Sequence, residues 1–312
     1  MSVENQSLES DFLENNFLAP PLDSQRALIV EGGAMRGIFA SGVLDAFMEY
    51  DFKPYDFAIG VSAGASNLVG YIANAPKRSY DVITKLATSP EFFNPTRFLK
   101  GGDLVDVEWL WHQSNQRYPI DKDKFYTSLP FWAAVTNIET GKADYYRIDE
   151  HNADNAMVAT AALPIAFKST PCFSGGCFSD GGVADSIPVK EAYRRGARDI
   201  TVVLSHPLNY QKSESKTPWL IKRLLSRTPG LAKAMVMRNK TYNEALDFIR
   251  NPPSDAKIKV IAPPNNFTVK RLTMNKAVLN QGYEMGLSAG KEHITNLKGL
   301  NGLTEENCHF CI

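Results

Sequence analysis

The chain of 312 residues lacks an excess of charge of either sign. Lysine and arginine together number 34, and aspartate and glutamate together also number 34. Proteins that bind nucleic acid through their overall charge carry a basic surplus, so the balance removes that argument and predicts no nucleic-acid partner. Hydrophobic residues make up 44% of the chain and charged residues 22%, which is typical of a soluble globular protein.

Long hydrophobic runs are also missing. No apolar stretch approaches the roughly 20 residues that a membrane-spanning helix needs. The N-terminal stretch MSVENQSLESDFLENN is acidic and polar, which is not typical of a secretory signal. The sequence therefore predicts a cytoplasmic protein, either free or in peripheral contact with a membrane.

Cysteine is scarce, and four cysteines are too few for a disulfide scaffold in a chain of this length. Two of them, Cys308 and Cys311, form a C-x-x-C pair near the C-terminus. A single pair of this kind without a second half-site is a weak metal or redox signal. We interpret it as part of a polar tail.

Strand-like and helix-like segments alternate along most of the chain. Short runs rich in β-branched residues predict strands at 26–30, 56–60, 131–138, 143–148, 199–204 and 256–262. Apolar residues at helical spacing predict helices at 36–50, 79–87, 153–163, 188–195, 218–248 and 273–296. This alternation favours an α/β fold with a mostly parallel sheet covered by helices.

One serine stands between two glycines in the stretch Gly60-Val61-Ser62-Ala63-Gly64. It follows a strand-like run and opens a segment of small residues. A strand, a sharp turn and a helix with a serine at the apex make a nucleophile elbow, in which glycines allow a turn too tight for side chains. The motif alone also fits an ordinary strand-to-helix turn with a serine N-cap, so its meaning depends on the neighbouring motifs.

A glycine-rich loop, EGGAMRG, joins the first predicted strand to the first helix. Its backbone N–H groups could form a phosphate cradle, an oxyanion hole or simply a tight turn. No Walker lysine follows, and Ala34 occupies a position where the dinucleotide motif requires glycine. Because a candidate nucleophile follows on the next strand, the oxyanion hole is the better interpretation.

A serine hydroxyl needs a base to take its proton. Asp180, in the stretch Ser179-Asp180-Gly181-Gly182, is one candidate, although an aspartate before two glycines is often just a turn residue. His206 is another, since it directly follows the strand at 199–204 and completes the chain order of an ordinary hydrolase triad. The residues themselves leave a Ser62–Asp180 dyad and a Ser62–Asp180–His206 triad open.

Four motifs in order resemble the patatin-like phospholipase family, in its bacterial branch: EGGAMRG, GVSAG, the small-residue block 159–167, and SDGG. The resemblance runs from about residue 26 to 188. It implies a three-layer α/β fold with helices on both faces of a mostly parallel sheet. It also implies an N-terminal arm at 1–24, a catalytic domain at 25–206 and a mainly helical C-terminal extension at 207–312 with one late strand.

The resemblance further implies a catalytic dyad without histidine, with Ser62 as nucleophile and Asp180 as proton acceptor. The backbone N–H groups of Gly32, Gly33 and Ala34 would form the oxyanion hole. The residues that flank these motifs are Arg36, Gly37, Gly60, Gly64, Gly181 and Gly182. The family commonly has glycine in place of Ala34, and if that position needs a positive φ the alanine is strained by roughly 1–2 kcal/mol.

The function that the resemblance implies is lipid acyl hydrolysis of the phospholipase A or lysophospholipase type, without a metal or organic cofactor. The substrate would be a phospholipid, a lysophospholipid or another acyl ester. Aromatic residues that could bury an acyl chain, or equally form part of the core, are Phe92, Phe93, Phe98, Trp109 and Trp111. The alternatives are a conventional esterase or thioesterase that uses His206, and a non-catalytic lipid-binding or regulatory protein.

Overall fold

The computed structural model of the chain describes residues 25–299. The predicted N-terminal arm at 1–24 and the Cys308 and Cys311 pair lie outside the described residues. The predicted α/β fold with a mostly parallel sheet is confirmed.

The described residues form one sheet of eight strands, in the order β5-β6-β3-β2-β1-β7-β8, with β4 also paired to β3. The strands are β1 (Gln25–Val30), β2 (Phe57–Val61), β3 (Phe131–Asn137), β4 (Ala143–Arg147), β5 (Cys172–Phe173), β6 (Gly176–Asp180), β7 (Ala197–Val203) and β8 (Lys257–Ile261). The run from β8 through β7, β1 and β2 to β3 is parallel, whereas β4 and β6 are antiparallel to β3.

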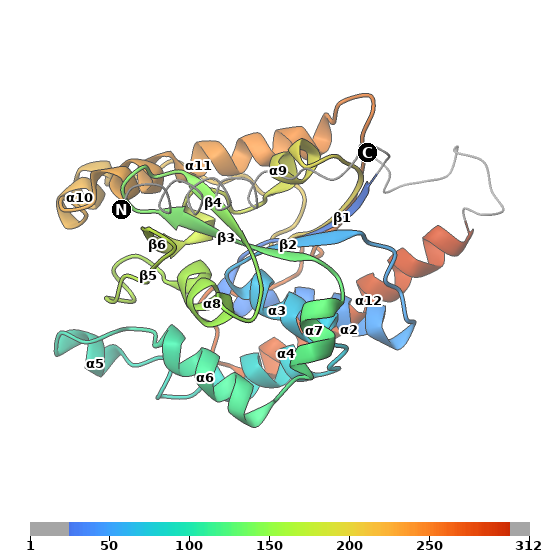
Figure 1. Cartoon of the computed structure of the whole chain (residues 1–312), viewed down its shortest axis with the longest axis horizontal. Coiled ribbons are helices and arrows are strands. Elements are labelled where there is room, and N and C mark those ends of the chain that lie inside the picture. The colour runs from blue at the N-terminus through green and yellow to red at the C-terminus, as the bar shows by residue number, and fades with distance from the viewer. Residues whose placement is uncertain (1–24, 300–312) are drawn as a thin grey trace, which may run out of the picture.

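Helices cover both faces of this sheet. They are α2 (Gly37–Glu49), α3 (Ala63–Ile72), α4 (Arg78–Asp81), α5 (Pro95–Leu99), α6 (Val107–Arg117), α7 (Lys122–Thr127), α8 (Ala153–Ala161), α9 (Val189–Arg194), α10 (Pro218–Leu224), α11 (Pro229–Arg250) and α12 (Lys276–Gly299). Shorter turns are η1 (Ala34–Arg36), η3 (Gly181–Val183) and the π-helical η2 (Val82–Leu86). In Figure 1, α9, α10 and α11 lie on one face and α2, α3, α8 and α12 on the other.

The apolar run of β1 explains why both faces are covered. Side chains alternate between the faces of a strand, so a strand buried on both sides has consecutive apolar residues. Ala27 and Ile29 pack in the core beneath α9 and α11, whereas Leu28 and Val30 pack in the core beneath α2, α3 and α12. All four side chains are fully buried.

The C-terminal segment is built into the same layers. β8 extends the sheet by pairing with β7. α12 crosses α2 so closely that a Cβ at Gly42 would collide with the Tyr283 carbonyl and one at Gly286 with the Phe39 carbonyl. The predicted domain boundary at residue 206 stays a prediction, since strand and helix on either side of it share one sheet and one core.

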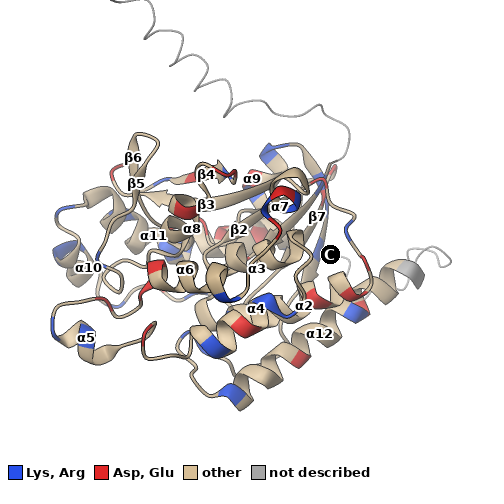
Figure 2. Ribbon diagram, turned by 60° about the horizontal axis from the view of Figure 1, so that its bottom comes forward, with Lys and Arg blue, Asp and Glu red and all other residues tan. Residues whose placement is uncertain are grey.

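The described helices include none that is both long and apolar enough to cross a membrane. Basic and acidic residues are interspersed over the helices in Figure 2, as the balanced composition leads one to expect. The segment between η2 and α7 contains α5 and α6. A disulfide joins Cys172 to Cys177 across the short β5–β6 hairpin.

Candidate active site

Ser62 lies at the apex of the turn between β2 and α3. Its backbone has φ 52° and ψ −122°, a conformation that L-residues rarely adopt and that functional turns often hold. The two glycines leave no room for side chains: a Cβ at Gly60 would lie 2.6 Å from the Ala65 Cα, and one at Gly64 would collide with the Val30 carbonyl oxygen. The predicted sharp turn is therefore present, with a half-buried serine at its tip.

Strand pairing explains how Asp180 comes to lie beside Ser62. β4 takes one edge of β3, and the other edge is shared by β2 and β6. β2 runs parallel to β3 and ends with Val61 opposite Ala134, whereas β6 runs antiparallel and ends with Asp180 opposite Val135. The two strands meet end to end at neighbouring residues of β3, so the residue after β2 is brought next to the last residue of β6.

The Asp180 carboxyl is 2% exposed, and burial raises its pKa above the ordinary value. Opposing effects come first from the Arg238 charge, then from hydrogen bonding to the Ser62 side chain and from the backbone N–H of Gly182. That N–H donates to Asp180 Oδ1 at 2.8 Å. The next residue is Gly181, and this position has no room for a side chain because a Cβ there would collide with the Ala134 carbonyl.

Thr160, near the C-terminal end of α8, holds the serine backbone. Its hydroxyl accepts a hydrogen bond from the Ser62 N–H at 2.9 Å and donates one to the Ala134 carbonyl at 2.5 Å. Two residues later, the Ala162 carbonyl accepts from the Asp180 N–H at 2.9 Å. The small-residue block 159–167 thus contacts both candidate catalytic residues, a role for Thr160 that the sequence motif did not reveal.

The loop Gly32-Gly33-Ala34 borders the serine. A Cβ on Gly32 would lie 3.3 Å from the Ser62 Cβ, so side-chain-free backbone faces the candidate nucleophile. Within the described chain, none of the three backbone N–H groups of this loop donates a hydrogen bond. The N–H of Met35, next in line, donates to the Arg271 carbonyl at 3.4 Å. Free N–H groups beside a serine are what an oxyanion hole requires.

Ala34 has φ 50°, so the condition for strain at this position is met. A left-handed alanine costs about 1–2 kcal/mol relative to an unstrained residue. Gly37, which opens α2, packs its backbone against α3, since a Cβ there would lie 3.0 Å from the Ala63 Cβ. The glycine-rich loop and the elbow helix are therefore in direct contact.

Two buried ionisable residues support the loop from behind. Glu31 accepts hydrogen bonds from the Ser205 N–H at 2.6 Å and from the Tyr242 hydroxyl at 3.1 Å, and burial raises its pKa. Arg36 is 6% exposed and donates to the Ser205 hydroxyl at 3.4 Å. The Arg36 Nε has no hydrogen-bond partner among the described residues.

His206 stacks on the Tyr210 ring, with 3.7 Å between ring centroids. Among the described residues it makes no hydrogen bond to Ser62 or Asp180. Burial, together with the charges of Arg36 and nearby basic groups, lowers its pKa to about 3. The imidazole is therefore neutral over the physiological range and is tied to a ring rather than to the serine.

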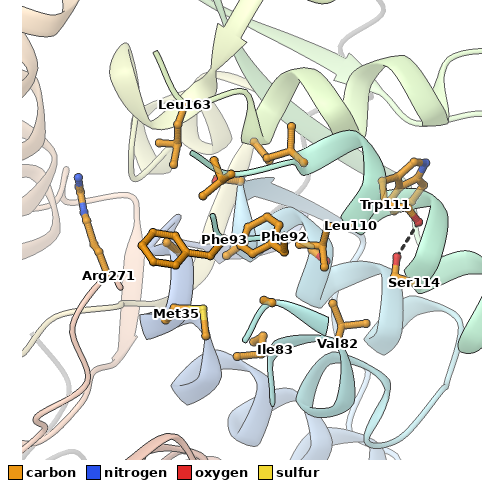
Figure 3. A pocket seen from close by; sticks show the side chains of 18 of the residues that line it. Met35, Val82, Ile83, Phe92, Phe93, Leu110, Trp111, Ser114, Leu163 and Arg271 are labelled. Carbon is orange, nitrogen blue, oxygen red and sulfur yellow. Dashed lines mark hydrogen bonds between the residues drawn. The ribbon is translucent and has the colours of Figure 1, made fainter. Parts of the chain in front are cut away.

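An apolar pocket with a cavity volume of about 110 Å³ opens beside Ser62. Figure 3 shows apolar side chains from several elements turned towards one another, among them Met35, Ile83 and Leu110. Of the five aromatic residues proposed for acyl-chain contact, Phe92, Phe93 and Trp111 line this pocket and the other two do not. The π-helical turn η2 contributes Val82 and Ile83 to the wall.

The chain is similar to several known proteins. The family model described as patatin-like phospholipase matches residues 28–193, and a domain of unknown function (DUF6363) matches residues 228–301. A protein of Escherichia coli (strain K12), described as uncharacterized protein YjjU, is 32% identical over 298 residues, covering 93% of this chain and 82% of that protein. The solved structure of VipD from Legionella pneumophila has a TM-score of 0.44 and 12% identity, covering 87% of this chain and 67% of VipD.

Proposed function

Because the chain belongs to the patatin-like phospholipase family, we propose that it hydrolyses carboxylic esters of lipids with Ser62 as nucleophile and Asp180 as proton acceptor. The observation that carries this proposal is the end-to-end meeting of β2 and β6 along β3. It brings a serine on a strained turn beside a buried carboxylate, which is the arrangement that activates a hydroxyl.

In the proposed reaction, Asp180 accepts the Ser62 proton while the serine Oγ attacks the ester carbonyl carbon. The developing oxyanion receives hydrogen bonds from the N–H groups of Gly32, Gly33 and Ala34, each worth about 10²–10³ in rate. Collapse expels the alcohol, which takes the proton from Asp180. Water then attacks the acyl-serine with Asp180 again as base, and the fatty acid and free serine are released.

The environment of Asp180 suits this role. A carboxylate is a weak base in water, and general bases work best when their pKa lies closer to the operating pH. Burial raises the pKa of Asp180 against the opposing Arg238 charge. The apolar pocket next to Ser62 supports a long acyl chain as the group that is bound.

The test uses a soluble 4-nitrophenyl acyl ester and a lysophospholipid with wild-type protein, Ser62→Ala and His206→Ala. We expect Ser62→Ala to lose hydrolysis of both substrates and labelling by a fluorophosphonate, and His206→Ala to retain both. Undiminished hydrolysis by Ser62→Ala would refute the proposal. Loss of activity in His206→Ala with an intact fold would favour the triad instead, and no labelling of any variant would favour a non-catalytic lipid-binding protein.

We also propose peripheral contact with a membrane through α10. This helix lies at one end of the molecule in Figure 1 and carries basic residues in Figure 2. Its side chains Trp219, Leu220 and Leu224 are 64%, 37% and 55% exposed. Exposed apolar residues beside Lys222 and Arg223 are typical of a helix that lies on an anionic lipid surface.

Sedimentation with vesicles of phosphatidylglycerol and phosphatidylcholine checks this contact. Trp219→Ser should reduce the bound fraction severalfold. Tyr50→Ser, which replaces another exposed aromatic residue at the end of α2, is the matched control and should not. Equal binding by the two variants would show that α10 is not the contact surface.

A further inference from the structure

A second cavity lies next to the apolar pocket that opens beside Ser62. Its cavity volume is about 70 Å³. Apolar side chains make up most of its lining, among them Val69, Phe125, Ile148 and Ala153. The proposed reaction leaves this cavity without a role.

Two side chains separate the second cavity from the apolar pocket. Trp111 on α6 and Met157 on α8 line both cavities and therefore stand between them. Among the described residues, no other side chain lines both. Figure 3 shows Trp111 at one end of the apolar pocket, opposite Arg271. We call Trp111 and Met157 the partition.

The two cavities follow one another between the same three helices, α3, α6 and α8. On α3, Ser66 lines the apolar pocket and Val69 lines the second cavity. On α8, Ala161 lines the pocket and Ala153, at the start of the helix, lines the second cavity. Because Ser62 precedes the first turn of α3, the second cavity is the more distant of the two from the serine.

The two members of the partition differ in freedom of movement. The Trp111 Nε1–H donates a hydrogen bond to the Asp154 carboxylate at 2.6 Å, which fixes the orientation of the indole ring. Met157 is 4% exposed, and its unbranched side chain can change rotamer within a packed core. Trp111 is therefore the fixed part of the partition, and Met157 is the part that can be displaced.

The position of the partition implies a limit on chain length. A group that extends from Ser62 to the level of Val69 spans about 10 Å, since each residue of a helix rises about 1.5 Å. An extended chain advances by about 1.3 Å per bond, so about eight carbons fill this distance. Any further carbons of an acyl chain on Ser62 meet the partition.

We propose that Trp111 sets the acyl-chain length that the protein prefers, and that the second cavity is a subsite for the methyl end of longer chains. This inference rests on the proposed hydrolase function and adds a specificity-determining residue to it. With Trp111 in place, chains of about eight carbons fit the apolar pocket, and longer chains must displace Met157. Removal of the indole joins the two cavities into one channel.

The experiment compares 4-nitrophenyl octanoate with 4-nitrophenyl dodecanoate, each below the concentration at which it aggregates. Wild-type protein should prefer the octanoate in kcat/KM by at least about tenfold, because the extra methylenes find no free space. Trp111→Ala should raise the ratio of dodecanoate to octanoate by about 10- to 100-fold, chiefly through KM, since each buried methylene contributes about fourfold in binding. Met157→Ala should raise the ratio in the same direction by a smaller factor.

Trp109→Ala is the matched control. It makes the same change on the same helix at a position that lines neither cavity, and it should keep the wild-type ratio. An unchanged ratio in both Trp111→Ala and Met157→Ala, each with a native circular dichroism spectrum, overturns the proposal. Equal kcat/KM for the two esters in wild-type protein also overturns it, while leaving the hydrolase function intact.

A double variant tests whether the second cavity receives the end of the chain. Ala153 lines that cavity and not the apolar pocket, so Ala153→Leu reduces the space in the second cavity alone. Added to Trp111→Ala, it should remove most of the gain for the dodecanoate. If the gain persists, the second cavity is not the subsite.

If Ser62→Ala retains hydrolysis, the proposed hydrolase function fails on its own. Calorimetric binding of octanoate and dodecanoate to Ser62→Ala still tests the partition without turnover. In this background, Trp111→Ala should strengthen dodecanoate binding relative to octanoate by about tenfold or more. An unchanged ratio of the two affinities refutes the role of Trp111.

Discussion

The two halves of the candidate site are built on different principles. The half from residues 28–193 consists of backbone groups and small side chains in direct contact, where a single methyl group at Gly64 would collide with the Val30 carbonyl. The half that follows residue 206 contributes long basic side chains from separate elements: Arg238 contacts the turn after Asp180, and Arg271 lines the pocket. Covalent chemistry requires that the reacting atoms are held at fixed positions, whereas attraction of an anion requires only that positive charge lies nearby.

Asp180→Asn should have the largest effect, and it should lower activity while it raises the stability of the fold. Loss of the proposed base should lower kcat by about 10²–10⁴. Because burial raises the pKa of Asp180, ionisation of this carboxyl costs stability near neutral pH, and a neutral amide avoids that cost. Urea unfolding should therefore show a more stable variant at about pH 7.5.

The same pKa shift fixes the sign of two pH effects. Below the ordinary aspartate pKa of 3.8, the carboxyl is protonated in both folded and unfolded chains, so the stability advantage of Asp180→Asn should shrink towards acid. The wild-type rate should fall with acid at a pH above that ordinary value, because a protonated Asp180 accepts no proton. An advantage that grows towards acid would contradict the assignment.

Gly64→Ala tests whether the half of the site built from residues 28–193 tolerates an added methyl group. The new Cβ would overlap the Val30 carbonyl and lie 2.7 Å from that of Glu31, which must displace the elbow from the glycine-rich loop. We expect kcat/KM for a 4-nitrophenyl ester to fall by more than about 10²-fold and the melting temperature to drop. If Arg271→Ala, measured in parallel, lost more kcat/KM than Gly64→Ala, the comparison between the two halves of the site would be reversed.

Thr160→Val should have a smaller effect because it removes one hydrogen bond from the backbone of the proposed nucleophile. Valine keeps the shape of threonine but cannot accept from the Ser62 N–H. We expect kcat to fall by about tenfold. Thr160→Ser, which restores the hydroxyl, should recover most of the rate, and failure of this rescue would indicate a packing role only.

Ala34→Gly should have the smallest effect and the opposite sign for stability. Glycine relieves the strain of φ 50°, but it also increases the entropy of the unfolded chain. A net gain of about 0.5–1 kcal/mol in the free energy of unfolding is expected, with kcat changed by no more than about threefold. Calorimetry and ester hydrolysis check this, and a loss of stability would show that Ala34 is not strained.

The strands of the parallel sheet could be predicted because each is a short, continuous apolar run. Residues 26–30 and 199–204 correspond to β1 and β7, which are buried on both faces. The short β5 and β6 hairpin escaped prediction, since its few residues show no strong alternation and depend on pairing with β3. α6 also escaped, as its exposed polar face obscures its helical spacing.

The candidate site was predictable to the extent that local sterics demand glycine. Ser62 and the loop at residues 32–34 stand out because glycines mark turns where no side chain fits. Thr160 gave no comparable signal, since a hydroxyl within a small-residue block looks like any other packing residue. Arg238 and Arg271 are basic residues in ordinary helical and loop contexts, and nothing in their neighbourhood along the chain indicates that one contacts the turn after Asp180 and the other lines the pocket.

By itself, the sequence determined that a serine stands on a tight strand-to-helix turn behind a glycine-rich loop, because these are consequences of local backbone sterics. Only the tertiary structure decided which residues face that serine. Asp180 lies beside Ser62 because β2 and β6 end at adjacent positions of β3, Ala134 and Val135. Such long-range strand pairing depends on the packing of the whole sheet and its helices.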